Sequence, residues 1–270
     1  MPQTMHTLSF YIRINMLPQE EYLEIKEFLQ HKVHEINTLD NIDRKNKRKR
    51  NSKYSLPNAN AFGWMPAINI CYSFEIGNNQ IMYMVPFRPF YRFLTFLLPQ
   101  ALYNYPNLFG TKDARDVIAA LYSVSGYDKI GDINEYQQYL TDNAYCYFLL
   151  RDIDGRLSGK LLRLDLFRYI LPNNKDDFDF IGGLMHAYRH CSWKNIKLSS
   201  GKGESELNSM WDLPLFIGKA ILTDKNSEVN DSTSFEENGR VWQINYHINK
   251  ETGVYYLRTA FATHKRLNSK

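Results

Sequence analysis

Two histidines stand four residues apart in the segment 182–190, with an arginine next to the second. The segment reads Gly-Gly-Leu-Met-His-Ala-Tyr-Arg-His, so His186 and His190 project from one face if it is helical. Arg189 then lies within one turn of both. A titratable pair beside a fixed positive charge can move protons next to a phosphate. The spacing therefore indicates acid–base chemistry on a phosphate ester.

The same spacing is also that of two zinc ligands on a helix. In the metalloprotease motif a glutamate follows the first histidine, whereas Ala187 stands here. A site made of His186, His190 and Cys191 needs a distant fourth ligand. We expect no metal and no cofactor, and a zinc-dependent enzyme is kept only as a third alternative. Walker, Gly-x-Ser-x-Gly and dinucleotide-binding patterns are absent from the sequence.

Further phosphate contacts are predicted in a glycine-rich loop and in a C-terminal hairpin. Backbone N–H groups of the loop 199–203 can cradle an anion, and Lys202 adds charge to it. The hairpin, residues 240–263, carries His247, Arg258 and Thr259. Strand alternation predicts one face with Tyr255, Leu257 and Phe261 and another with Tyr256, Arg258 and Ala260.

Segments 180–190 and 246–260 resemble two motifs of the BECR ribonucleases, the superfamily of barnase, EndoU, colicin and RelE-like enzymes. The first resembles the helix that bears a histidine, and the second resembles the last two strands. The resemblance implies that His186 is the general base or acid, with His190 or Arg189 as its partner. It also implies that Thr259 is the strand hydroxyl and that Tyr256 or Arg258 contacts phosphate. The polar segment 224–238 is longer than this pattern leads us to expect.

These residue types suit RNA cleavage without a metal. That reaction needs a base for the 2′-hydroxyl proton, an acid for the leaving 5′-oxygen and donors around the phosphate. Arginine binds two phosphate oxygens at once, and Tyr188 or Tyr256 can stack on an unpaired base. In the competing interpretation His186 is a partly buried structural residue, and the hairpin is an ordinary half-buried one.

The positive charge of the chain is concentrated in one run. The net charge is +4, and residues 44–50 hold six basic residues, without which 27 Lys and Arg face 29 Asp and Glu. This run is predicted to contact nucleic-acid phosphates, to serve as a targeting signal or to be a solvated loop. Its basic residues are Arg44, Lys45, Lys47, Arg48, Lys49 and Arg50. A non-enzymatic nucleic-acid- or protein-binding module that uses this run is therefore the alternative function.

The elements that must position these residues indicate an α+β fold of antiparallel hairpins with packed helices. Helices are expected over 18–35, 90–103 and 111–124, and hairpins over 68–85, 145–167 and 240–263. The polar segment 37–60 is expected to be a loop, of which 38–60 is the basic part. A polar, turn-rich stretch after Pro172 predicts two regions. Residues 173–270 would form a ribonuclease-like unit of one helix and a twisted antiparallel sheet. Residues 1–172 would regulate this unit, bind a partner or complete the same globule.

Composition places the chain in a reducing compartment. Three scattered cysteines form neither a disulfide framework nor a metal-spaced pair, and the N-terminus does not read as a secretory signal. The apolar segment 81–102 contains two arginines and three prolines, so integral membrane insertion is not expected. We therefore expect a cytoplasmic endoribonuclease, a hydrolase of toxin or effector type. Its partners would be RNA and, if the protein is toxic, a neutralising protein.

Overall fold

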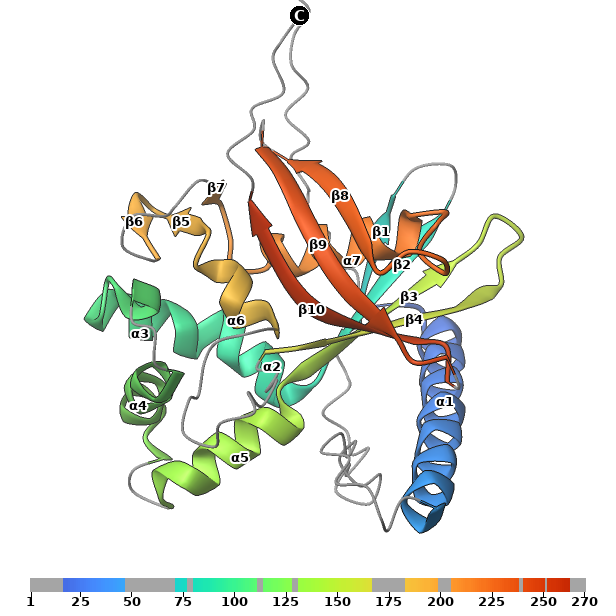
Figure 1. The fold of residues 1–270 in the computed structure, drawn as a ribbon, viewed down its shortest axis with the longest axis horizontal. Helices are drawn as coiled ribbons and strands as arrows, with labels where there is room; N and C mark the ends of the chain where they lie inside the picture. The colour runs from blue at the N-terminus through green and yellow to red at the C-terminus, as the bar shows by residue number, and fades with distance from the viewer. Residues whose placement is uncertain are drawn as a thin grey trace, which may run out of the picture.

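The computed structural model describes residues 17–46, 71–76, 80–110, 114–127, 131–166, 183–198, 205–237, 240–250 and 252–262. Its centre is a seven-stranded mixed sheet in the order β1-β2-β3-β4-β10-β9-β8 (Figure 1). Helices pack on this sheet, which confirms the predicted α+β class.

The sheet joins strands from both ends of the chain. Its strands are β1 (Tyr72–Glu75), β2 (Ile81–Pro86), β3 (Tyr145–Arg151), β4 (Leu157–Asp165), β8 (Ser232–Glu237), β9 (Arg240–Ile248) and β10 (Val254–Ala262). Neighbours pair antiparallel except β4 and β10, which pair parallel. The boundary predicted after residue 172 lies outside the described residues. Since β10 pairs with β4, strands β8, β9 and β10 of the C-terminal region join the sheet of the N-terminal region.

One face of the sheet, the helix-covered face, holds the larger core. Phe148, Leu162 and Leu257 point from the strands into it, where they meet residues such as Leu121 and Ile221. The helices that contribute are α2 (Arg88–Arg92), α3 (Leu98–Asn104), α4 (Ala114–Ser125), α5 (Ile133–Asn143), α6 (Gly183–Tyr188) and α7 (Asp212–Thr223), with a π-helical turn at Phe93–Leu97 and a 3-10 turn at Leu108–Gly110. A small sheet of β5 (Cys191–Trp193), β6 (Ile196–Lys197) and β7 (Ser205–Leu207) follows α6.

The opposite face, here called the α1 face, is covered at one end by α1 (Gln19–Asn46) (Figure 1). Ile25 and Leu29 of α1 pack in a second core with Tyr83, Leu149 and Val254. An ion pair also joins α1 to β3, since Glu24 accepts a hydrogen bond of 2.7 Å from the Arg151 guanidinium. Both faces of β3 are therefore covered, which explains why its first six residues are buried.

Two elements differ from the sequence-based expectation. Helix α1 continues to Asn46, so the loop predicted from residue 37 is wrong over its first ten residues. That stretch has no apolar periodicity, but most of its residues are compatible with a helix. Strand β8 lies in the segment 224–238 that we expected to be a polar loop. It is a polar edge strand that pairs only with β9, so its sequence resembles that of a loop.

Candidate functional site

A β-bulge in β10 determines which side chains of the closing hairpin share a face. The register of β10 against β9 shifts between Leu257 and Thr259. Because a bulge adds one residue, the alternation reverses after it. Ala260 returns to the helix-covered core, and Phe261, which pairs with Gln243, lies on the α1 face. The prediction that Phe261 shares a face with Leu257, and Ala260 with Tyr256, is therefore wrong.

An exposed histidine and arginine meet on the α1 face beside the bulge. His247 pairs with Tyr256 across the two strands, and its Nδ1 lies 3.4 Å from Nη2 of Arg258. Nη1 of Arg258 lies 3.8 Å from an Asp231 carboxylate oxygen, with 44% of the arginine side chain exposed. This arrangement presents an imidazole and a guanidinium together at the surface. The sequence singled out both residues, but it did not predict their contact.

The same face continues into a buried ion pair on β4. Register places Tyr147, Arg163, Tyr256 and His247 in one row across β3, β4, β10 and β9. Arg163 is 5% exposed, and its Nε and Nη2 atoms lie 2.8 and 2.7 Å from one Asp165 oxygen. Burial acts to lower the pKa of Arg163, whereas Asp165 and the neighbouring tyrosines act to raise it, with a raised pKa as the result. The guanidinium therefore stays charged.

Aromatic rings enclose this ion pair. The Arg163 guanidinium lies 4.1 Å from the centroid of the Tyr145 ring, a cation–π distance. Burial raises the pKa of both Tyr145 and Tyr147, so these hydroxyls stay protonated. Our reading of the sequence did not select Arg163 or Asp165. The signal was present, however, because two charges two residues apart interrupt the leucine-rich strand 161–166.

Helix α6 brings the histidine pair next to β10. The helix ends at Tyr188, and His190 follows in a turn, where its N–H donates to the Ala187 carbonyl at 3.1 Å. The two imidazole centroids are 5.9 Å apart. Gly183, with φ 73°, begins the helix in a conformation that L residues rarely adopt. The predicted proximity of the two rings is thus present, although only His186 lies in the helix.

The two histidines differ in access to solvent. His190 is 8% exposed, and its ring lies 6.3 Å from Trp242 and 6.1 Å from Phe261. His186 is half-buried. Packing between two aromatic rings suits a structural role for His190 better than direct contact with a substrate.

Two further predicted residues carry buried polar atoms. The Nε of Arg189 and the Oγ1 of Thr259 are inaccessible to solvent and have no hydrogen-bond partner among the residues that the structure describes. The Arg189 backbone N–H donates to the His186 carbonyl at 3.2 Å. Tyr256 is half-buried beside the second core. Thr259 pairs with Asn245 two positions before Phe261, which contacts the His190 ring, so the helix and the strand residues belong to one neighbourhood.

The remaining predicted contacts are only partly described. Arg44 and Lys45 belong to the last turn of α1, whereas Lys47, Arg48, Lys49, Arg50 and Lys202 lie outside the described residues. No helix in the described part of the chain is both long and apolar enough to cross a membrane. Among the same residues, no three His, Cys, Asp or Glu side chains are grouped so that they could hold a metal ion.

Comparisons with protein-family models, with curated proteins and with solved structures each find no match. The chemistry of the α1 face and of α6 is therefore the basis on which a function can be proposed.

Proposed function

We propose that this chain is a metal-independent ribonuclease whose active site is the α1 face around β9 and β10. The observation that carries the proposal is the exposed His247–Arg258 contact of 3.4 Å. It shares its sheet face with Tyr256 and Thr259, and α6, which carries His186, packs against the same strand, β10. A proton-transfer group beside a fixed cation is what phosphodiester cleavage requires.

The reaction assigns a role to each group. One imidazole accepts the proton of the 2′-hydroxyl, the 2′-oxygen forms a bond to phosphorus, and the bond from phosphorus to the 5′-oxygen breaks. The other imidazole protonates that leaving oxygen, and a 2′,3′-cyclic phosphate results. His247 and His186 serve as this pair. The His186 and His190 ring centroids are 5.9 Å apart, and the His190 ring lies 6.1 Å from Phe261 of the α1 face, so the end of α6 reaches that face at the edge of β10. Arg258 binds the phosphate oxygens, on which negative charge accumulates.

The surrounding residues position these groups. If Nδ1 of His247 accepts the Arg258 N–H, the neutral ring carries its proton on the other nitrogen and has its free lone pair at Nδ1. When Arg258 turns to the phosphate, Nδ1 can accept the 2′-hydroxyl proton, which makes His247 the base and His186, in its protonated form, the acid. His190, packed between Trp242 and Phe261, holds the end of α6 against β10. The Tyr256 ring offers a surface on which an unpaired base can stack. The proposal thus replaces His190 by His247 as the partner of His186.

The test is cleavage of a labelled RNA oligonucleotide by the purified protein in the presence of EDTA. His247→Ala and His186→Ala should each lower the cleavage rate by about a hundred- to ten-thousandfold. His31→Ala is the matched control, because His31 is exposed on α1 outside the site. Its rate should equal that of the wild type. Equal rates for all four proteins, each of them folded, would refute the assignment of both histidines.

A nucleic-acid-binding module without catalysis is the second candidate. It is favoured by the course of α1, whose C-terminal end, with Arg44 and Lys45, extends away from the sheet (Figure 1). Binding through the run 44–50 should weaken with salt, because each neutralised phosphate releases counterions. Replacing the six basic residues of the run by glutamine should abolish such binding, and His247→Ala should leave it unchanged.

A further inference from the structure

A cavity on the helix-covered face lies at the end of the sheet where α7 finishes. Its volume is about 750 Å³, within the range of small-molecule sites. Strands β3, β4, β9 and β10, the end of α7 and the connection from α7 to β8 contribute to its wall, together with Gln80, which precedes β2. Tyr255 lines it, whereas Tyr256 lies on the other face, since successive strand residues point in opposite directions. The cavity is therefore separate from the proposed ribonuclease site.

The inner wall of this cavity is apolar and rigid. Leu150, Leu222 and Tyr255 line it and belong to the main core, with exposures of 5%, 1% and 2%. The Tyr255 hydroxyl is held 3.3 Å from the hydroxyl of Ser227, which is completely buried. Ile248, which also lines the cavity and is only half-buried, adds accessible apolar surface to this wall. A flat ring can pack there, because the burial of apolar surface favours binding.

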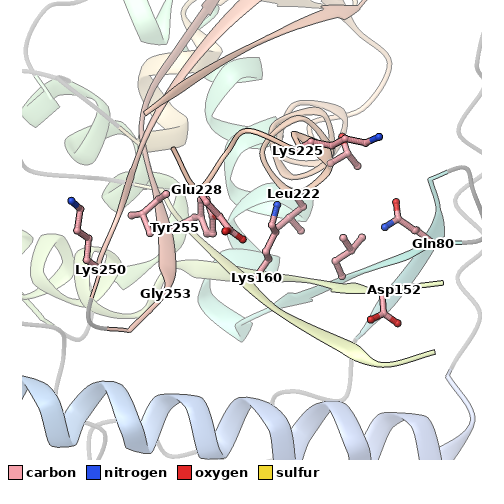
Figure 2. A pocket seen from close by; sticks show the side chains of 12 residues that line it. Gln80, Asp152, Lys160, Leu222, Lys225, Glu228, Lys250, Gly253 and Tyr255 are labelled. Atoms are coloured by element: carbon pink, nitrogen blue, oxygen red, sulfur yellow. The ribbon is translucent and has the colours of Figure 1, made fainter. Parts of the chain in front are cut away.

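Charged groups surround the apolar wall, with an excess of cations. Lys160, Lys225 and Lys250 line the cavity together with Asp152 and Glu228. In Figure 2, Lys250 and Lys225 lie at opposite ends of the cavity, with Lys160 between them. Nζ of Lys160 donates to the Asp224 carbonyl at 3.2 Å and to Ser227 Oγ at 3.0 Å. Lys160 thus fixes the connection after α7 and leaves Lys225 and Lys250, both exposed, at the rim.

We propose that this cavity binds a mononucleotide. The base packs against the wall of Leu150, Leu222 and Tyr255, and the phosphate is held by the rim ammonium groups of Lys225 or Lys250. The Glu228 carboxylate and the Gln80 amide, which also line the cavity, supply hydrogen-bond partners for ribose hydroxyls or exocyclic amines. A wall that suits a ring, combined with a cationic rim, selects a ligand in which a planar apolar group carries an anion.

The proposal is tested by calorimetric titration of the full chain with AMP, GMP, CMP and UMP, each alone. Adenosine and inorganic phosphate serve as half-ligand probes and should bind at least about tenfold more weakly than the best nucleotide. The double variant Lys225→Glu/Lys250→Glu should weaken binding by at least about tenfold. Lys197→Glu is the matched control, since Lys197 is exposed on β6 and does not line the cavity.

The outcomes separate this site from the proposed ribonuclease site. Binding that survives His247→Ala and Lys197→Glu but not the double variant supports the cavity. Failure of all four nucleotides to bind in the millimolar range overturns the inference. Binding that is lost in His247→Ala and kept in the double variant also overturns it, because the nucleotide then occupies the α1 face. That last result would leave the ribonuclease proposal intact.

Discussion

Removal of the Asp165 carboxylate should strongly destabilise the fold, because it leaves the Arg163 charge buried. The guanidinium is 5% exposed and makes its two short contacts, 2.8 and 2.7 Å, with a single Asp165 oxygen. Breaking a buried ion pair by deleting one partner costs about 3–5 kcal/mol. The Tyr145 ring, 4.1 Å away, still faces the cation and contributes about 2 kcal/mol when desolvated. We therefore expect Asp165→Ala to cost about 3 kcal/mol, the lower end of the range.

The reverse deletion should cost less. The Asp165 side chain is 16% exposed, so the carboxylate left by Arg163→Met keeps some access to water. A cost of about 1–3 kcal/mol is expected for such a partly solvated group. The double variant Arg163→Met/Asp165→Leu leaves no buried charge, so it should be more stable than Asp165→Ala alone.

Urea unfolding followed by circular dichroism measures these differences. Asp231→Ala is the control, because Asp231 is 78% exposed and lies 3.8 Å from Arg258. It should change the unfolding free energy by less than about 0.5 kcal/mol. A cost below about 1 kcal/mol for Asp165→Ala, with an unchanged denaturant slope, would refute the reasoning. The pair would then behave like a surface ion pair.

Three other predictions concern packing, thiol reactivity and pH. Gly218→Ala in α7 should lower the unfolding free energy in urea by about 1–3 kcal/mol, because the added Cβ would lie 2.6 Å from a Phe148 ring carbon. Adding Phe148→Leu should recover part of that loss, and an unchanged unfolding free energy for Gly218→Ala would contradict the close approach. Burial raises the pKa of Cys71 to about 12, so at pH 8 its thiol should be alkylated on the order of a thousandfold more slowly in the folded than in the unfolded protein. Equal alkylation rates would contradict this burial of the Cys71 thiol. Burial also raises the pKa of Asp212, so the stability that this carboxyl contributes falls as pH rises from about 4 through its folded pKa. Asp212→Asn keeps an oxygen that accepts from two backbone N–H groups, so its unfolding free energy relative to the wild type should increase over that pH range. Parallel curves of unfolding free energy against pH would contradict this.

Local patterns predicted the hairpins but not the arrangement of the sheet. Turn-forming residues at 77–79 and 152–159 of the sequence lie between apolar segments, so β1–β2 and β3–β4 were predictable from neighbouring residues. The parallel pairing of Val254 with Leu161 joins strands almost a hundred residues apart. Nothing in the sequence of either strand indicates this pairing, which is why two separate regions were expected.

Several residues of the proposed site were predicted from the sequence, but their arrangement in space was not. His186 was chosen by type and spacing, and Arg258 and Thr259 received their roles from the resemblance to ribonucleases; the structure packs α6 against β10. The bulge after Leu257 has no simple sequence signal, and it reassigns Ala260 and Phe261 to the opposite faces. Burial of His190 depends on Trp242 and Phe261, which approach it only in the folded chain.

Attack by the 2′-hydroxyl is the central claim, and a pair of matched oligonucleotides tests it directly. One is RNA, and the other has the same sequence with a single 2′-deoxyribose at the cleaved position. In EDTA, the purified protein should cut the RNA to a 2′,3′-cyclic phosphate and leave the deoxy-substituted bond intact. Cleavage of both substrates at equal rates, or of neither, would contradict the account.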